Sequence, residues 1–230
     1  ATANASTTSV SIAGITVSAK DSADKPVFGY GFTPSVAATI TPKPLEGTLI
    51  GSVSRTYNGT PLATLSASNY SLSGLVGNES FTVNKTRGTF DNQNVGSSLL
   101  VTTTLGPADY LAGTGTRLTN YVLPSTMSGA IGAITPRPLS ATLTGEITRV
   151  YDGTTKAGLS AGNFNLSGLV AGETISVTQA QGQFASPNAG TGVTVTAELG
   201  NSNFAAVSGT SLANYSLPTI VSGAIGNIIP

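Results

Sequence analysis

The sequence predicts an all-β protein made of tandem Ig-like β-sandwich domains in an elongated array. Three observations support this fold class. Apolar and polar residues alternate with the period of a β-strand in many short segments. Glycine, proline, asparagine and aspartate interrupt these segments at intervals of roughly 8–12 residues, as in sandwiches and barrels. Finally, the chain repeats its own sequence without a gap. A β-grasp-like or other small β domain is the alternative.

The repeat copies a whole domain. Residues 40–133 align with residues 134–227 at a spacing of 94 residues, and 45 of the 94 aligned positions are identical. A segment of this size can bury its own hydrophobic core. We therefore expect two complete β repeats, one in each of these segments.

The two ends of the chain resemble parts of further repeats. Asn4-Ala5-Ser6 resembles Asn188-Ala189-Gly190, so residues 1–39 are predicted to be the C-terminal part of a preceding, more divergent repeat. Residues 228–230 resemble the start of a next repeat. The first residues show no signal-peptide pattern, and we therefore expect a fragment of something longer.

Within each repeat the pattern predicts strands. Residues 193–199 show the clearest alternation, with apolar valine, alanine and leucine separated by threonine and glutamate. A short helical turn is expected near residues 107–111. The predicted strands lie near residues 43–50, 52–57, 69–76, 79–84, 98–105, 118–123 and 127–133, and at the same places 94 residues later.

The connection between the two repeats is short and contains prolines. Residues 128–139 include Pro136 and Pro138 and lack a long glycine- and serine-rich tract. A connection of this kind limits the bending between successive domains. We therefore expect the chain to be a monomeric rod.

One four-residue motif occurs in both repeats and predicts a structural turn. The first copy is Tyr57-Asn58-Gly59-Thr60 and the second is Tyr151-Asp152-Gly153-Thr154. Asn-Gly and Asp-Gly between extended segments are the strongest short signal for a tight hairpin, because both central residues must tolerate positive φ.

The composition excludes several classes of function. The chain has no histidine and no cysteine, which removes the Ser-His-Asp and Cys-His nucleophile systems and the usual zinc and haem ligands. Charged residues make up only 9% of the chain and the net charge is zero, so nucleic acid is not an expected partner. No run is long and apolar enough to insert in a membrane. We expect no cofactor and no metal.

The acidic residues do not predict an enzyme. Hydrolysis by paired carboxylates needs two acids that face one bond, whereas Glu79 and Glu173 are the only acidic position kept in both repeats. We therefore expect no catalytic residues. Arg55 and Arg149 also recur, and the simplest interpretation is an ion pair at the surface or at the junction, with Glu79 or Glu173 as candidate partners.

Most aromatic residues recur at equivalent positions, which indicates core packing rather than a sugar-binding platform. The recurring pairs are Tyr57/Tyr151, Tyr70/Phe164, Phe90/Phe184, Tyr110/Phe204 and Tyr121/Tyr215. Phe28, Tyr30, Phe32 and Phe81 lack this pairing. They are the remaining candidates for an exposed apolar contact.

Several motifs of the second repeat form a characteristic set. They are Ile134-Thr135-Pro136-Arg137-Pro138-Leu139, Val150-Tyr151-Asp152-Gly153-Thr154-Thr155, the segment from Leu166 to Glu173, Gly182-x-Phe184, Asn188-Ala189-Gly190 and Ala213-Asn214-Tyr215-x-Leu217. Together these motifs resemble the YDG-type repeat and the related MBG repeat. The resemblance covers residues 40–227. The first repeat departs from the pattern because Asn58 replaces the acidic residue of the turn.

The resemblance implies a place and a function. Such repeats occur in very large bacterial surface and biofilm-matrix adhesins, many of which resemble filamentous haemagglutinin and leave the cell by two-partner secretion. We therefore expect extracellular stalk or scaffold repeats that project a distal binding region and support adhesion between cells or to the matrix. The alternative is that the repeats themselves bind matrix polysaccharide or host glycans, or associate with neighbouring adhesin molecules.

Overall fold

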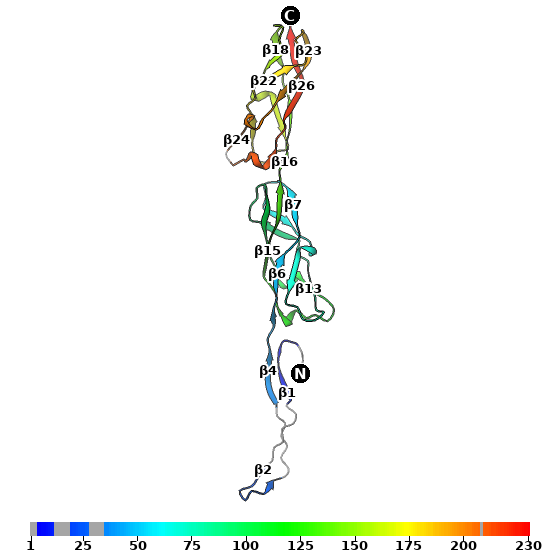
Figure 1. Ribbon diagram of the computed structural model, residues 1–230, viewed down its shortest axis with the longest axis vertical. Helices are drawn as coiled ribbons and strands as arrows, with labels where there is room; N and C mark the ends of the chain where they lie inside the picture. Colours follow the sequence, from blue (N-terminus) through cyan, green and yellow to red (C-terminus); the bar gives the residue numbers. More distant parts are fainter. Residues whose placement is uncertain (1–3, 12–18, 28–34, 208) are drawn as a thin grey trace. The chain divides into compact units, whose positions relative to one another are not determined.

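The computed structural model describes residues 4–11, 19–27, 35–207 and 209–230 (Figure 1). These residues form β-strands, short 3₁₀ turns and loops, and they contain no α-helix. The predicted all-β class is therefore confirmed. In this part of the chain no helix is long and apolar enough to cross a membrane.

The chain divides into two compact units that do not coincide with the sequence repeats. The first unit contains Ala1–Gly51, Thr64–Gly88 and Thr102–Gly129. The second unit contains the whole second repeat, and it also includes Ser52–Ala63 and Thr89–Val101 from the first repeat. Segments of the first repeat are thus part of the same compact body as the second.

The first unit contains several two-stranded sheets. The antiparallel pairs are β1 (Ser6–Ser11) with β4 (Ser35–Ile40), β2 (Ala19–Lys20) with β3 (Pro26–Val27), β6 (Glu46–Leu49) with β9 (Tyr70–Ser73) and β10 (Phe81–Val83) with β13 (Tyr110–Ala112). A parallel pair joins β5 (Lys43–Pro44) to β14 (Tyr121–Val122).

Each repeat also contains one five-stranded sheet. In the first repeat its strands, in spatial order, are β7 (Val53–Thr56), β15 (Thr126–Thr135), β12 (Gly96–Thr104), β11 (Arg87–Phe90) and β8 (Leu62–Thr64). In the second repeat they are β18 (Ile147–Val150), β26 (Ile220–Ile229), β23 (Gly190–Glu198), β22 (Gln181–Phe184) and β19 (Lys156–Gly158). The edge strands β7 and β18 run parallel to β15 and β26.

Three two-stranded sheets complete the second repeat. They are the antiparallel pairs β17 (Ser140–Leu143) with β20 (Phe164–Ser167) and β21 (Ile175–Val177) with β24 (Phe204–Ala206), and the parallel pair β16 (Arg137–Pro138) with β25 (Tyr215–Ser216). The 3₁₀ turns of the two repeats are η1 (Ala67–Asn69), η2 (Pro107–Asp109), η3 (Leu118–Asn120), η4 (Ala161–Asn163), η5 (Asn201–Asn203) and η6 (Leu212–Asn214).

The core of the second repeat lies between β17–β20 and the five-stranded sheet. Leu143, Val195 and Val221 are buried there. Gly223 of β26 allows the two layers to approach closely, since a Cβ at this position would lie 2.9 Å from the carbonyl oxygen of Leu143. Gly226 leaves room in the same way for the ring of Phe184.

The sequence pattern missed three short strands of the first repeat. The segments now seen as β8, β11 and β13 had no predicted strand, because Leu-Ala-Thr, Arg-Gly-Thr-Phe and Tyr-Leu-Ala show no alternation of apolar and polar residues. The helical turn expected near residues 107–111 is η2, and it is followed directly by β13.

The recurring Asn-Gly and Asp-Gly motifs form turns but not the predicted tight hairpins. Strands β7 and β8 lie at opposite edges of their sheet, as do β18 and β19, so the strands on either side of each motif do not pair. Gly59 and Gly153 have φ of 74° and 76°, whereas Asn58 and Asp152 do not have positive φ. Each motif is therefore part of a connection that runs from one edge of a sheet to the other.

Candidate functional site: a contact between the repeats

Tyr57 from the first repeat is buried against the second repeat, inside the second compact unit. It follows β7 by one residue, and its backbone N–H donates to the carbonyl of Thr135 at 2.9 Å. Its hydroxyl donates to Oε1 of Glu173, and its ring packs edge-to-face on Tyr215 with ring centroids 5.6 Å apart. Only 2% of Tyr57 is exposed.

Glu173 accepts hydrogen bonds from two tyrosines. Its Oε1 accepts from Tyr57, and its Oε2 accepts from the hydroxyl of Tyr215. The same Tyr215 oxygen accepts from the N–H of Val170 at 3.0 Å, and the N–H of Glu173 donates to the carbonyl of Val170 at 3.0 Å. The turn between Val170 and Glu173 thus fixes the carboxylate in position.

The surroundings raise the pKa of both phenols. Burial is the main cause for Tyr215, followed by its hydrogen bond to Glu173, and together they raise its pKa to about 12. The pKa of Tyr57 is raised by burial first and then by its hydrogen bond to the same carboxylate. Both phenols therefore stay protonated, and remain hydrogen-bond donors, well above neutral pH.

A buried asparagine makes a second contact between the repeats. Oδ1 of Asn214 accepts from the N–H of Val95 at 2.9 Å, and its Nδ2 donates to Oδ1 of Asn94 at 2.9 Å. The side-chain amide thus satisfies a donor and an acceptor of the first repeat together. Because Asn214 is buried, leaving either group unpaired would cost free energy.

The first unit contains the equivalent arrangement. The hydroxyl of Tyr121 donates to Oε2 of Glu79 and accepts from the N–H of Val76 at 3.0 Å. Asn120 accepts from the N–H of Ala5 at 3.0 Å and donates to Oδ1 of Asn4 at 3.1 Å. The same residue types at the same spacing therefore build the same local geometry twice.

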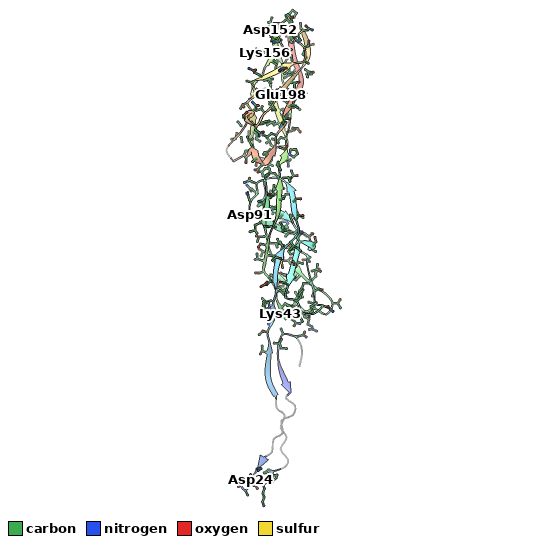
Figure 2. All side chains as sticks on the ribbon, viewed as in Figure 1. Asp24, Lys43, Asp91, Asp152, Lys156 and Glu198 are labelled. Atoms are coloured by element: carbon green, nitrogen blue, oxygen red, sulfur yellow. The ribbon has the colours of Figure 1, made fainter. Side chains whose placement is uncertain are left out.

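In the second repeat, the recurring arginine Arg149 binds the turn formed by Tyr151-Asp152-Gly153-Thr154, which we call the YDGT turn. Nη1 of Arg149 contacts Oδ1 of Asp152 at 2.9 Å and donates to the carbonyl of Lys156 at 3.0 Å. Figure 2 labels Asp152 and Lys156 at the same end of this unit. The guanidinium also lies over the ring of Phe184, 4.9 Å from its centroid. The N–H of Thr154 donates to Asp152 at 2.9 Å, which is the main cause of the lowered pKa of that carboxyl.

Arg55 has the same role in the first repeat. Its guanidinium donates to Asn58 and to the carbonyl of Thr60, and lies 5.3 Å from the centroid of Phe90. Neither arginine contacts the recurring glutamate: the carboxylate partner of Arg149 is Asp152, and Glu173 binds tyrosines instead. The predicted ion pair with Glu79 or Glu173 is therefore not formed. Each arginine instead binds the turn of its own repeat.

The candidates for exposed aromatic contact have different positions. Phe28, Tyr30 and Phe32 lie outside the described residues. Phe81 is half-buried and packs edge-to-face on Tyr110 and Tyr121, with ring centroids 6.2 Å and 5.6 Å apart.

Sequence reasoning singled out the recurring glutamate but not its partners. The role of Asn120 and Asn214 was missed, although their recurrence next to a recurring tyrosine was an available signal. Among the residues that the structure describes, no group of three or more histidine, cysteine, aspartate or glutamate side chains could hold a metal ion. The side chains of Tyr57, Glu173 and Asn214 form hydrogen bonds that connect the two repeats.

These features define an all-β, tandem-repeat protein whose repeats contact each other through tyrosine, glutamate and asparagine side chains. Residues 41–129 and 135–222 each match the model of the YDG domain, and the chain belongs to the YDG domain family. No curated protein and no solved structure matches the chain.

Proposed function

We propose that these YDG domains are structural repeats in the stalk or scaffold of a secreted bacterial adhesin. Their task is to project a distal binding region from the cell surface or into the biofilm matrix, after two-partner secretion. We also propose that each repeat folds as an Ig-like β-sandwich. The domain family and the repeat pattern support it.

The observation that carries this proposal is the burial of Tyr57 against Glu173 and Tyr215. A flexible chain of independent domains has no need for side chains of one repeat to be buried by the next. A spacer that transmits force needs contacts of this kind, because they resist bending and shear at the joint in addition to the covalent connection. The β-sheet ladders of each repeat resist pulling in the same way.

Small-angle X-ray scattering tests the proposal. A compact globule of this length has a radius of gyration of roughly 17 Å. We expect a clearly larger value, with the profile of a stiff rod. A value near the compact figure would contradict a spacer function, because the repeats would then fold back on each other.

Direct ligand binding by the repeats is the second candidate. A mainly apolar cavity of about 420 Å³ in the first unit favours it, with Leu105, Tyr110, Leu118 and Leu123 in its wall. Binding of matrix polysaccharide or host glycan can be measured by isothermal titration. Replacing Leu118 by aspartate should abolish such binding if this cavity is the site, and unchanged binding would exclude the cavity.

A further inference from the structure

The first unit contains a half-open pocket at the end where β4 leads into the first repeat. The pocket has a volume of about 270 Å³. Its wall includes Thr41, Val76, Glu79, Asn120 and Tyr121.

Each of these five residues has a counterpart, 94 positions later, in the surroundings of Tyr57. The counterparts are Thr135, Val170, Glu173, Asn214 and Tyr215. Thr135 accepts the N–H of Tyr57, and Glu173 and Tyr215 bind its hydroxyl and its ring. Val170 lies against Gly59 of the same loop, 2.9 Å from where a Cβ on that glycine would be. The pocket in the first unit therefore has the residues that in the second unit surround a tyrosine loop.

Among the strands that the structure describes, the neighbouring sheet has an edge on which no strand is paired, and we call it the open edge of β4. Strand β4 is the counterpart of β15, and its pairing with β1 corresponds to the pairing of β15 with β12. On its other edge β15 pairs in parallel with β7, where Arg55 lies opposite Ile134 and Thr56 lies opposite Thr135. Within the described residues β4 pairs only with β1. Backbone groups on an open strand edge are available to a further strand.

We propose that this pocket and the open edge of β4 together bind an extended segment that ends in a tyrosine, of the kind formed by β7 and Tyr57, from another YDG repeat. The segment adds to β4 as a parallel strand, which is a known mode of peptide recognition. Its tyrosine enters the pocket, donates its hydroxyl to Glu79 and packs its ring on Tyr121. Its backbone N–H donates to the carbonyl of Thr41.

Tyr121 and its counterpart Tyr215 both have a raised pKa, with different main causes. Burial is the main cause of the raised pKa of Tyr215, which Tyr57 covers. For Tyr121 the main cause is the hydrogen bond to Glu79, and burial comes second. The hydrogen-bonded pair of tyrosine and glutamate is therefore formed in both units, and both tyrosines are buried.

The test is a titration of the full chain with a synthetic peptide that has the sequence of residues 52–61, followed by nuclear magnetic resonance. We expect the backbone amide signals of Val76 and Asn120 to move at millimolar peptide, while those of Val170 and Asn214 stay in place. A peptide with alanine in place of the tyrosine should bind at least about tenfold more weakly, since it loses both the ring contact and the hydroxyl.

Two protein variants make the test specific. Glu79→Gln should weaken peptide binding by about tenfold, because a neutral amide is a poorer acceptor than a carboxylate. Glu173→Gln is the matched control, since it makes the same change where Tyr57 already fills the site, and it should leave peptide binding unchanged.

Three results would overturn the proposal. They are the absence of shifts at millimolar peptide, equal shifts with the alanine peptide, and equal weakening by the two glutamine variants. If the same signals also move with protein concentration alone, and stop moving in Tyr151→Ala, the repeat that supplies the segment is the second repeat of another copy of the chain, which supports the proposal. The titration and the scattering experiment answer separate questions, so either can fail without the other.

Discussion

Tyr57 and Tyr151 occupy equivalent positions in the two repeats, yet 2% of Tyr57 and 52% of Tyr151 is exposed. The two residues follow equivalent edge strands and begin the same turn. They differ in what covers them, since Glu173 and Tyr215 lie against Tyr57. Tyr151 is therefore an internal control for changes made at Tyr57.

Removing the hydroxyl of Tyr57 should weaken the fold. In Tyr57→Phe the Oε1 atom of the half-buried Glu173 loses its donor, and we expect the free energy of unfolding to fall by about 1–2 kcal/mol. Tyr151→Phe removes an exposed hydroxyl and should change it by less than about 0.5 kcal/mol. Urea denaturation of both variants measures the difference. Equal losses would show that the contact with Glu173 contributes nothing.

Ionisation of buried tyrosine should destabilise the protein at high pH. The pKa of Tyr215 is raised to about 12, whereas a tyrosine in an unfolded chain ionises near about 10. The folded state holds the proton more tightly, so this stabilisation is complete below about pH 10 and is lost as the pH rises towards about 12. Denaturation at a series of pH values should show a falling free energy of unfolding across that window.

The variant Tyr215→Phe tests the source of that fall. It removes one of the buried phenols and should make the decline shallower, while Tyr151→Phe should leave the profile as it is. Burial also raises the pKa of Tyr110 to about 12, so part of the decline should remain. A decline that is equally steep in both variants would exclude Tyr215 as a contributor.

Loss of the Asn214 side chain should release the backbone of Val95. The N–H of Val95 donates to Oδ1 of Asn214, so Asn214→Ala should speed hydrogen exchange of this amide. We expect an acceleration of about tenfold or more, which corresponds to the loss of a hydrogen bond of about 1.4 kcal/mol. The internal reference is the amide of the buried Leu159, which donates to the carbonyl of Ala180 at 2.9 Å. If both amides accelerate together, the effect is a general loss of stability and not the loss of this contact.

The YDGT turn requires glycine at one position. Gly153 has φ of 76°, where a side chain is strained, and Gly153→Ala should lower the free energy of unfolding by about 1–2 kcal/mol. Gly158 lies in β19 without positive φ, and a Cβ there meets nothing within 4 Å. Gly158→Ala should therefore be neutral or slightly stabilising. Thermal unfolding of the two variants compares them, and a similar loss in both would contradict the conformational explanation.

Replacing Arg149 by lysine should not be a conservative change. The guanidinium contacts Asp152, Thr154 and the carbonyl of Lys156 together, and it lies over Phe184. A lysine ammonium cannot bridge this number of acceptors while it stacks on a ring. We expect Arg149→Lys to lose about 1–3 kcal/mol of stability in chemical denaturation. Arg117→Lys provides a control elsewhere in the chain, and an equal effect there would contradict a special role for Arg149.

The sequence by itself determined the all-β class and the YDG repeat. Alternation of apolar and polar residues depends only on neighbours in the chain, and the 94-residue repeat is visible by alignment alone. The recurring glutamate could also be singled out, because it is the one acidic position shared by the two repeats.

Only the tertiary structure decided what these residues contact. Glu173 lies 116 positions from Tyr57, and Asn214 lies 119 positions from Val95. The Asp152-Gly153 turn joins opposite edges of a sheet instead of adjacent strands. Pairings of this kind depend on which strands become neighbours and in which register. A local pattern contains no information on that choice, because it is made by the packing of the whole sheet.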